Sequence, residues 1–252
     1  MNRILLILIF ACTTNMVVGQ QLDKTFQHGE ELKYRIHYGI VNAGYATLSV
    51  TENKDAYHFV GKGWTVGMTN VFFKVRDQYE SYVNKETLKP DHFVRDVREG
   101  GYRQNRDIYF DHKNKLAKVE DHRQNTVKEY PIDDVQDLMS AFYKMRSVKI
   151  DTMAVGSSIH LDLFLDAETF KFKLVLLGKE TIKSKYGKIP CYKFRPYVQS
   201  GRIFKEEESL TIWISEDKNK IPVRLKASLA VGSLKMDLTE YKGLTHAFPQ
   251  KL

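Results

Sequence analysis

Cysteine is scarce in this chain of 252 residues, which has only Cys12 and Cys191. Cys12 falls within residues 1–20, a segment that we predict to be a signal peptide. Once that segment is cleaved, Cys191 is the only thiol, so the mature chain cannot form an intramolecular disulfide. Its stability must then come from apolar side chains buried in a core.

Long apolar runs are also rare. The run from Ile4 to Ala11, which follows Arg3, is too short to span a bilayer, and no later stretch reaches the roughly 18 apolar residues of a transmembrane helix. With the small residues near Gly19, this run predicts a secretory signal. We expect the mature chain to be exported, to the periplasm or the outer membrane of a bacterium, without a transmembrane segment. Lipidation of Cys12, after a sequence that loosely resembles a lipoprotein signal, is the alternative.

Motifs for catalysis and metal binding are missing as well. The eight histidines are scattered, with no HExxH motif and no Cys/His spacing typical of zinc, and no serine lies in a GxSxG motif. An oxygen-rich metal site could be built from His160, Asp162, Asp166 and Glu168, although a solvated strand edge is the simpler explanation of these residues. The sequence therefore predicts no catalytic residue, no metal and no cofactor. An unrecognised hydrolase is the second alternative, after the two binding functions that the sequence suggests.

The net charge is mildly basic at +8, and lysine and arginine are scattered singly along the chain. No nucleic-acid motif is present, so we expect no nucleic-acid partner. A basic face could hold the protein by peripheral contact near anionic lipid head groups, whereas ordinary solvated charge is the simpler explanation.

What dominates the sequence is alternation of apolar and polar residues, in one set over 31–130 and another over 159–241. Gly61 within a predicted strand, and the long alternating run from Val71 to Val83, indicate strong curvature. We predict a mainly β fold in one domain over 29–246. It is a curved antiparallel sheet or open barrel of about ten strands.

One central α-helix is predicted between the two β sets, over about 133–146. Its apolar face is formed by Val135, Leu138, Met139 and Phe142. Asp133 is a suitable N-cap, with Gln136 three residues later. We expect this helix to pack against the concave face of the sheet, either as core or as a plug over a ligand cavity.

Three blocks of sequence carry a family resemblance: GEELKYRIHYGIVNAGYATLSV, DLMSAFYKMR and LTIWISEDKNKIPVRLKASLAVGSLKMDL. In this order, over Gly29 to Tyr241, they resemble the bacterial envelope family called domain of unknown function 3108. The resemblance implies an exported, β-rich protein with no established activity and no catalytic residues to transfer. The general shape is also similar to periplasmic lipoprotein carriers, in which an open β-barrel holds acyl chains beneath a helix; fold alone does not fix function.

Large rings on the predicted strand faces are typical both of β cores and of amphipathic ligand sites. The candidate ligand-binding residues are Trp64, Phe73, Met139, Phe142 and Trp213. The leading hypothesis is a non-enzymatic envelope protein that binds a lipid or a lipidated protein in a β cup. The alternative is a module with a filled core that binds an envelope protein partner.

Overall fold

The computed structural model describes residues 24–198 and 210–248. The predicted signal peptide, with Cys12, lies outside the described residues. Fifteen strands form one sheet within the described part of the chain. They are β1 (Glu31–Tyr38), β2 (Val41–Glu52), β3 (Ala56–Thr65), β4 (Arg76–Asn84), β5 (Pro90–Glu99), β6 (Tyr102–Asp111), β7 (Leu116–Asp121), β8 (Thr126–Pro131), β9 (Val135–Gln136), β10 (Ser158–Leu165), β11 (Glu168–Ser184), β12 (Gly187–Val198), β13 (Leu210–Ser215), β14 (Pro222–Ser228) and β15 (Ser233–Lys242). The two helices are α1 (Gly67–Phe72) and α2 (Leu138–Arg146).

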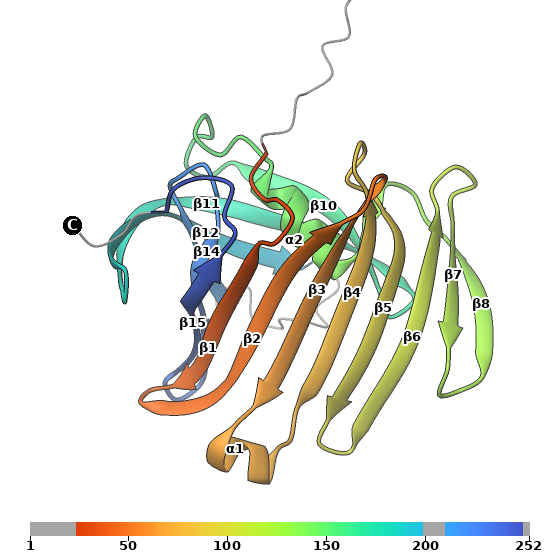
Figure 1. Cartoon of the computed structure of the whole chain (residues 1–252), viewed down its shortest axis with the longest axis horizontal. Coiled ribbons are helices and arrows are strands. Elements are labelled where there is room, and N and C mark those ends of the chain that lie inside the picture. Colours follow the sequence, from red (N-terminus) through yellow and green to blue (C-terminus); the bar gives the residue numbers. More distant parts are fainter. Residues whose placement is uncertain (1–23, 199–209, 249–252) are drawn as a thin grey trace, which may run out of the picture.

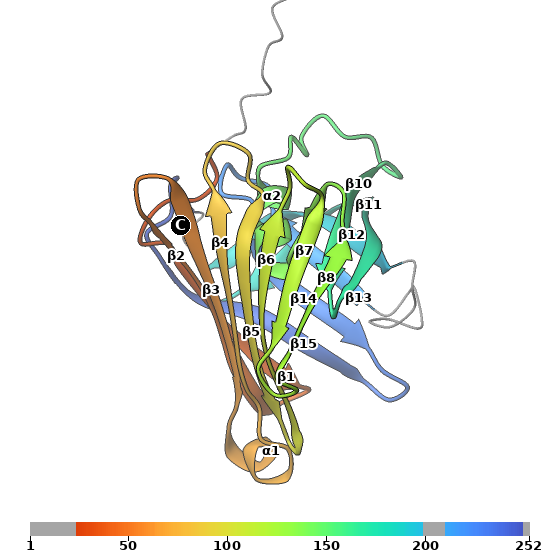
Figure 2. The same cartoon turned by 90° about the vertical axis from the view of Figure 1, so that its right-hand side faces the viewer.

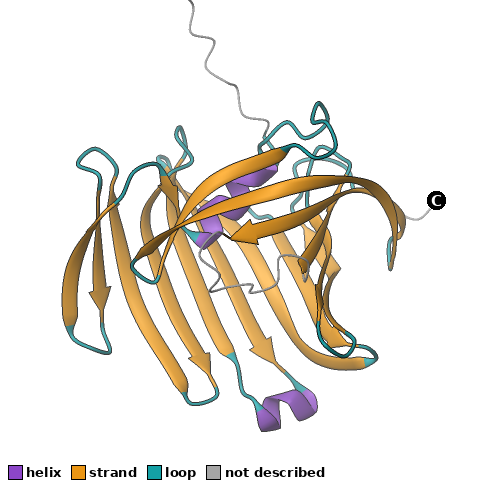
Figure 3. Cartoon of the chain, turned by 180° about the vertical axis from the view of Figure 1, so that it is seen from behind, coloured by secondary structure: helices purple, strands orange, loops and turns teal. Residues whose placement is uncertain are grey.

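The sheet curls until its two edges approach each other. Its order is β8-β7-β6-β5-β4-β3-β2-β1-β15-β14-β13-β12-β11-β10-β9, so β8 and β9 lie at opposite edges. Only residues 132–134 connect these two strands, and so short a connection spans at most about 14 Å. The sheet therefore forms an incomplete barrel around α2 (Figures 1 and 3). The predicted curved, open β architecture is confirmed.

The prediction of about ten strands was too low. Hairpin turns of two residues, such as 39–40 and 166–167, fit more strands into the same length of chain. Asp166 and Ala167 both have positive φ, 54° and 65°, which is the geometry of a tight hairpin turn. In the part of the chain that the structure describes, all strand pairs are antiparallel except β9 with β10. No helix among the described residues is long and apolar enough to cross a membrane.

The central helix begins later than predicted. Val135 and Gln136 pair with β10 as strand β9, because this pairing satisfies backbone groups that the first helical turn would leave without partners. Asp137, rather than Asp133, is the N-cap: its side chain accepts hydrogen bonds from the backbone N–H of Met139 at 2.7 Å and of Ser140 at 2.8 Å. The Ser140 hydroxyl accepts from the Asp137 N–H at 2.9 Å, which completes a capping box.

The buried face of α2 also differs from the predicted one. Leu138 is 42% exposed, whereas Met139, Tyr143 and Arg146 are buried. The Tyr143 ring stacks on Phe59 of β3 with centroids 3.9 Å apart. This face packs on the concave side of β3 to β7, where α2 lies in Figure 1. Rings and methionine thus fill the space between helix and sheet.

Gly61 on β3 lets α2 approach the sheet closely. A Cβ atom at this position would lie 2.9 Å from the Met139 sulfur and 3.4 Å from Leu48. We expect Gly61→Val to lower the free energy of unfolding by about 2 kcal/mol, because the added methyl groups overpack this contact. Urea denaturation measures the change, and Gly63→Val is the control, since a Cβ there meets nothing within 4 Å. Equal losses in both variants would contradict the prediction.

The long alternating run from Val71 to Val83 does not form one continuous strand. Helix α1 occupies residues up to Phe72, and β4 begins only at Arg76. The pairing of β2 with β3 ends at Gly44 and Thr65, so the following residues have no β2 neighbour to continue the ladder. Gly67, with a positive φ of 53°, turns the chain there. Helix α1 projects from the lower end of the sheet in Figures 1 and 2.

Candidate functional site

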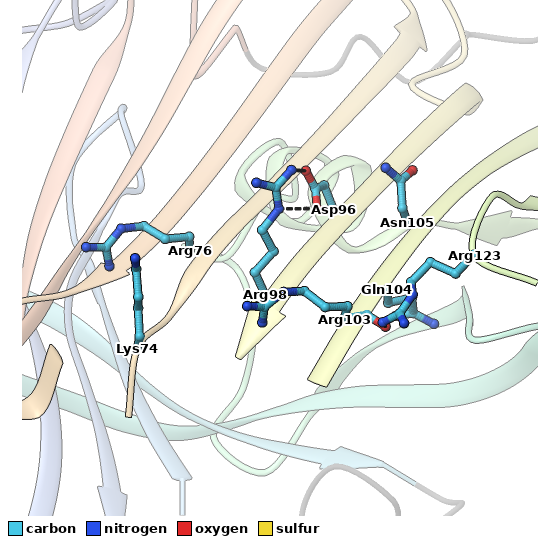
Figure 4. Close-up of a pocket in the computed structure, with 8 residues that line it drawn as sticks. All are labelled: Lys74, Arg76, Asp96, Arg98, Arg103, Gln104, Asn105 and Arg123. Atoms are coloured by element: carbon cyan, nitrogen blue, oxygen red, sulfur yellow. Dashed lines mark hydrogen bonds and ion pairs between the residues drawn. The ribbon is translucent and has the colours of Figure 1, made fainter. Parts of the chain in front are cut away.

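A basic cavity of about 450 Å³ lies near this lower end, over β4, β5 and β6. Its lining residues are Lys74, Arg76, Asp96, Arg98, Arg103, Gln104, Asn105 and Arg123. We call this cavity the basic cleft. Figure 4 shows Lys74 and Arg76 on one side of it and Arg103 and Arg123 on the other, with Arg98 and Asp96 between them.

Strand register brings these residues together. Arg98 on β5 lies directly opposite Arg103 on β6, and Asp96 lies opposite Asn105. Because side chains alternate along a strand, Asp96 and Arg98 lie on the face opposite to buried Val97. The cations of β4 and β5 therefore point away from α2.

The cleft extends to β6 because β7 is short. The pairing of β6 with β7 stops at Arg106 and Asp121, which leaves the first residues of β6 beyond the end of β7. Arg123, in the turn after β7, bridges this step: its Nη1 donates to the backbone oxygen of Arg103 at 2.8 Å. This contact places a fifth cation at the edge of the cleft.

The charge of the cleft is only partly neutralised. Arg98 donates to both oxygens of Asp96, at 3.0 and 2.7 Å. Arg103 donates instead to the backbone oxygens of Gly100 and Tyr102, each at 2.9 Å. Among the described residues, no carboxylate lies within ion-pair distance of the remaining four cations, which are Lys74, Arg76, Arg103 and Arg123. Guanidinium groups with unused N–H donors are suited to phosphate and carboxylate groups.

Two carboxyl groups lie on the inner face behind the cleft. Burial raises the pKa of Glu99, and the neighbouring charge of Asp77 raises it further, against the opposing effect of Arg95. Asp77 also accepts a hydrogen bond from the Arg98 backbone N–H at 3.0 Å. Glu99 therefore keeps its proton to a higher pH than an exposed glutamate does.

A second cavity, of about 460 Å³, lies elsewhere and has a different character. It is lined by Lys24, Asp151, Tyr192, Glu216, Asp217, Lys218, Lys220 and His246. Three carboxylates here balance three lysines. This cavity therefore lacks the excess of one sign that would select an anion.

The structure separates the five predicted ligand-binding residues. Trp64 lines a hollow of about 280 Å³ that shares Arg76 and Arg98 with the basic cleft. Phe73, half exposed, lies at the lower end of the sheet, where its ring is 3.0 Å from the Cβ position of Gly100. These two residues thus lie beside the cleft.

The other three contact the apolar core. Met139 on α2 is buried in the main apolar cluster, and Phe142, also on α2, is partly buried and packs against this cluster. Trp213 is buried in a different cluster, where its Nε1 donates to Glu180 at 3.1 Å. The structure therefore does not bring the five residues into one site.

The oxygen-rich group that the sequence offered for a metal is dispersed. Asp166, at the β10–β11 turn, accepts from Gln104 at 3.1 Å and from Arg106 at 3.3 Å, and it pairs with Arg95. It thereby ties the turn to β5 and β6 across the opening. His160 instead contacts Ser158 at 2.7 Å. The described part of the chain contains no group of three or more His, Cys, Asp or Glu residues arranged to hold a metal ion.

Sequence reasoning missed the cations of the cleft, because they are far apart in the chain. One usable sign was present. Gly100 and Gly101 predict a turn, and a hairpin around that turn places Arg98 and Arg103 opposite each other. Like charges directly opposite each other on paired strands are unfavourable, so an anion bound between them would relieve their repulsion.

A family model described as "Protein of unknown function (DUF3108)" matches residues 33–239. A comparison with curated proteins gave no match. Among solved structures, a β-barrel-like protein of domain of unknown function DUF1849 from Brucella abortus is similar, with a TM-score of 0.61 and 9% identity, over 86% of this chain and 98% of that chain. At this identity the likeness establishes the fold alone.

Two further structures align over nearly their whole length. One is a candidate exported protein with a YmcC-like fold from Bacteroides fragilis, with 12% identity, a TM-score of 0.34, and coverage of 88% of this chain and 99% of that chain. The other is a candidate lipoprotein from Parabacteroides distasonis, with 12% identity, a TM-score of 0.36, and coverage of 88% and 98%. Their TM-scores are too low to support an argument.

Proposed function

This chain belongs to the DUF3108 family of proteins of unknown function, and we propose that it is a non-enzymatic envelope protein that binds the anionic head group of an amphipathic ligand in the basic cleft. The cations gathered around one cavity support this proposal most directly. The envelope location rests on the signal peptide predicted for residues 1–20.

The chemistry of the cleft favours a small anion over a neutral molecule. A volume of about 450 Å³ is in the range of small-molecule sites. Arg103 and Arg76 already use N–H groups on backbone oxygens, which fixes their orientation before a ligand arrives. Preorganised cations bind an anion at a lower entropic cost.

The adjoining hollow supports an amphipathic ligand. Trp64 lies there across from Arg76, and its ring centroid is 6.0 Å from that of Tyr45. An apolar part of the ligand can lie on these rings while its phosphate or carboxylate meets the arginines. In this proposal the ligand contacts the outer face of the sheet, whereas the sequence led us to expect contact inside the cup.

Dihexanoyl phosphatidic acid, below its critical micelle concentration, is a suitable soluble probe. We expect isothermal titration calorimetry to detect binding to the chain expressed from Gln21, and the double variant Arg76→Gln/Arg103→Gln to weaken it about tenfold. The loss follows from removing two charge-assisted hydrogen-bond donors at a partly solvated site.

The matched control is Lys24→Gln/Lys218→Gln in the second cavity, which lowers the net charge by the same amount. It should leave the affinity unchanged. If both double variants weaken binding equally, the attraction is a general charge effect. If the unaltered chain does not bind, the proposed function is wrong.

An acidic segment of a protein partner is the second candidate for the same cleft. It is favoured by the position of much of the cleft on β5 and β6, two strands with polar outer faces. Competition decides between the two: a poly-glutamate peptide that displaces the lipid probe at lower concentration than inorganic phosphate would favour the protein partner.

A further inference from the structure

The end of the molecule beside the basic cleft exposes apolar side chains. Helix α1 has no buried residue, and its sequence GMTNVF carries no charge. Val71 is 75% exposed and Phe72 is 80% exposed, and Ile40 at the β1–β2 turn is 95% exposed. Single exposed apolar residues are ordinary, but a contiguous group of them marks an interaction site.

Three segments lie at this lower end of the molecule, and Figure 2 shows the β14–β15 turn to one side of α1. The Val66 N–H donates to the Ala43 oxygen at 3.0 Å, which fixes α1 beside the start of β2. The Tyr38 hydroxyl donates to the Val231 oxygen at 2.6 Å, which joins the β1–β2 and β14–β15 turns. We call the exposed apolar residues of these segments the apolar rim: Ile40, Val41, Met68, Val71, Phe72 and Val231.

Cations stand directly behind the apolar rim. Lys74 and Arg76 of the basic cleft follow α1 in the chain. Lys226 and Lys235 face each other across β14 and β15, two residue pairs behind that turn, and among the described residues neither has a carboxylate within ion-pair distance. Arg35 on β1 donates to the Ile40 oxygen at 3.4 Å. In a bilayer, the lipid phosphates lie just outside the hydrocarbon. The apolar rim could therefore contact the hydrocarbon while the cations next to it contact the phosphates.

We propose that the apolar rim inserts into the interface of a bilayer containing anionic lipid and holds the basic cleft at the level of the head groups. This inference rests on the proposed function, since it places the cleft where anionic amphipathic ligands are found. Insertion removes the apolar side chains from water, and the cations then meet lipid phosphates.

Co-sedimentation with vesicles tests the inference. The chain from Gln21 retains every described residue and lacks the apolar N-terminal run, which would itself bind lipid. We expect its partition onto vesicles of equal parts phosphatidylglycerol and phosphatidylcholine to exceed that onto pure phosphatidylcholine about tenfold. Val71→Ser/Phe72→Ser, which changes no charge, should reduce the partition about tenfold. The control is Val127→Ser, where the replaced valine is 62% exposed on the edge strand β8, away from α1 in Figure 1; this variant should bind like the parent.

The outcomes separate the two proposals. A rim variant that loses vesicle binding but still binds dihexanoyl phosphatidic acid supports insertion by the rim. A rim variant that keeps vesicle binding overturns the insertion and leaves the cleft proposal intact. A parent chain that ignores vesicles but forms dimers in sedimentation velocity, abolished by Val71→Ser/Phe72→Ser, also overturns it, because the rim would then be a protein interface.

Discussion

Replacement of Arg146 by methionine should lower the free energy of unfolding by about 4 kcal/mol, because it leaves a carboxylate buried without its partner. Arg146 is 2% exposed and Glu30 is 1% exposed. The guanidinium donates to both Glu30 oxygens, at 2.6 and 2.9 Å. It also donates to the backbone oxygens of Thr25 at 2.7 Å and of Asn219 at 3.1 Å. One side chain thus connects the end of α2 to the segment before β1 and to the β13–β14 turn.

Urea denaturation of matched variants isolates this effect. Tyr143→Phe is the control in the same buried region, because the Tyr143 hydroxyl has no hydrogen-bond partner among the described residues; its removal should change the free energy of unfolding by less than about 0.5 kcal/mol. Arg146→Met/Glu30→Met should be more stable than Arg146→Met alone, since no charge remains unpaired. A loss below about 1 kcal/mol in the single variant would show that the ion pair contributes little to stability.

Arg146 also shows where sequence patterns stop being informative. At the C-terminal end of a predicted helix, an arginine is expected to be exposed and to interact with the helix dipole. Its burial depends on Glu30, more than a hundred residues earlier in the chain. Only the pairing of β1 with β15 and the curl of the sheet bring the two together. Local alternation carries no information about such a contact.

The β architecture could be predicted because each strand has one buried face. Apolar and polar residues therefore alternate along the strand, and this pattern is visible in the sequence. Curvature was also predictable from Gly61, where the Cβ position confirms a close approach by Met139. The start of α2 could not be predicted, because Val135 and Gln136 adopt strand geometry through their pairing with β10. Tertiary pairing overrides local propensity there.

The candidate site was less predictable than the fold. Of the five candidate residues, Trp64 and Phe73 lie beside the basic cleft, and the other three contact the apolar core. The choice favoured large rings because they dominate amphipathic sites. The cleft itself depends on register, which sets Arg98 against Arg103 and lets Arg123 reach the same edge. Register follows from turn geometry and edge pairing, and a list of charged residues does not contain it.

The ionisation of Asp137 should make the stability of the protein fall as the pH rises from about 4 to about 6. Asp137 is fully buried, and this burial raises its pKa to about 6, against the opposing hydrogen bonds from Ser81, Ser140 and Met139. A carboxyl group with a raised pKa holds its proton more tightly in the folded chain than in the unfolded one. Its stabilising contribution is therefore complete below pH 4 and is lost as the pH passes through 6.

Asp137→Asn removes this titration and keeps an oxygen that can cap α2. Relative to the parent, the variant should gain about 3 kcal/mol between pH 4 and pH 7, at about 1.4 kcal/mol per pKa unit. Urea denaturation at a series of pH values measures the gain.

The control is Asp133→Asn, four residues earlier, where the hydrogen bond from Lys115 lowers the pKa of the exposed carboxyl. Its contribution has the opposite sign, since it is present above pH 4 and lost as the pH falls. A pH-independent difference between Asp137→Asn and the parent would mean that Asp137 is ionised in the folded protein throughout this range, stabilised by its three hydrogen bonds despite its burial.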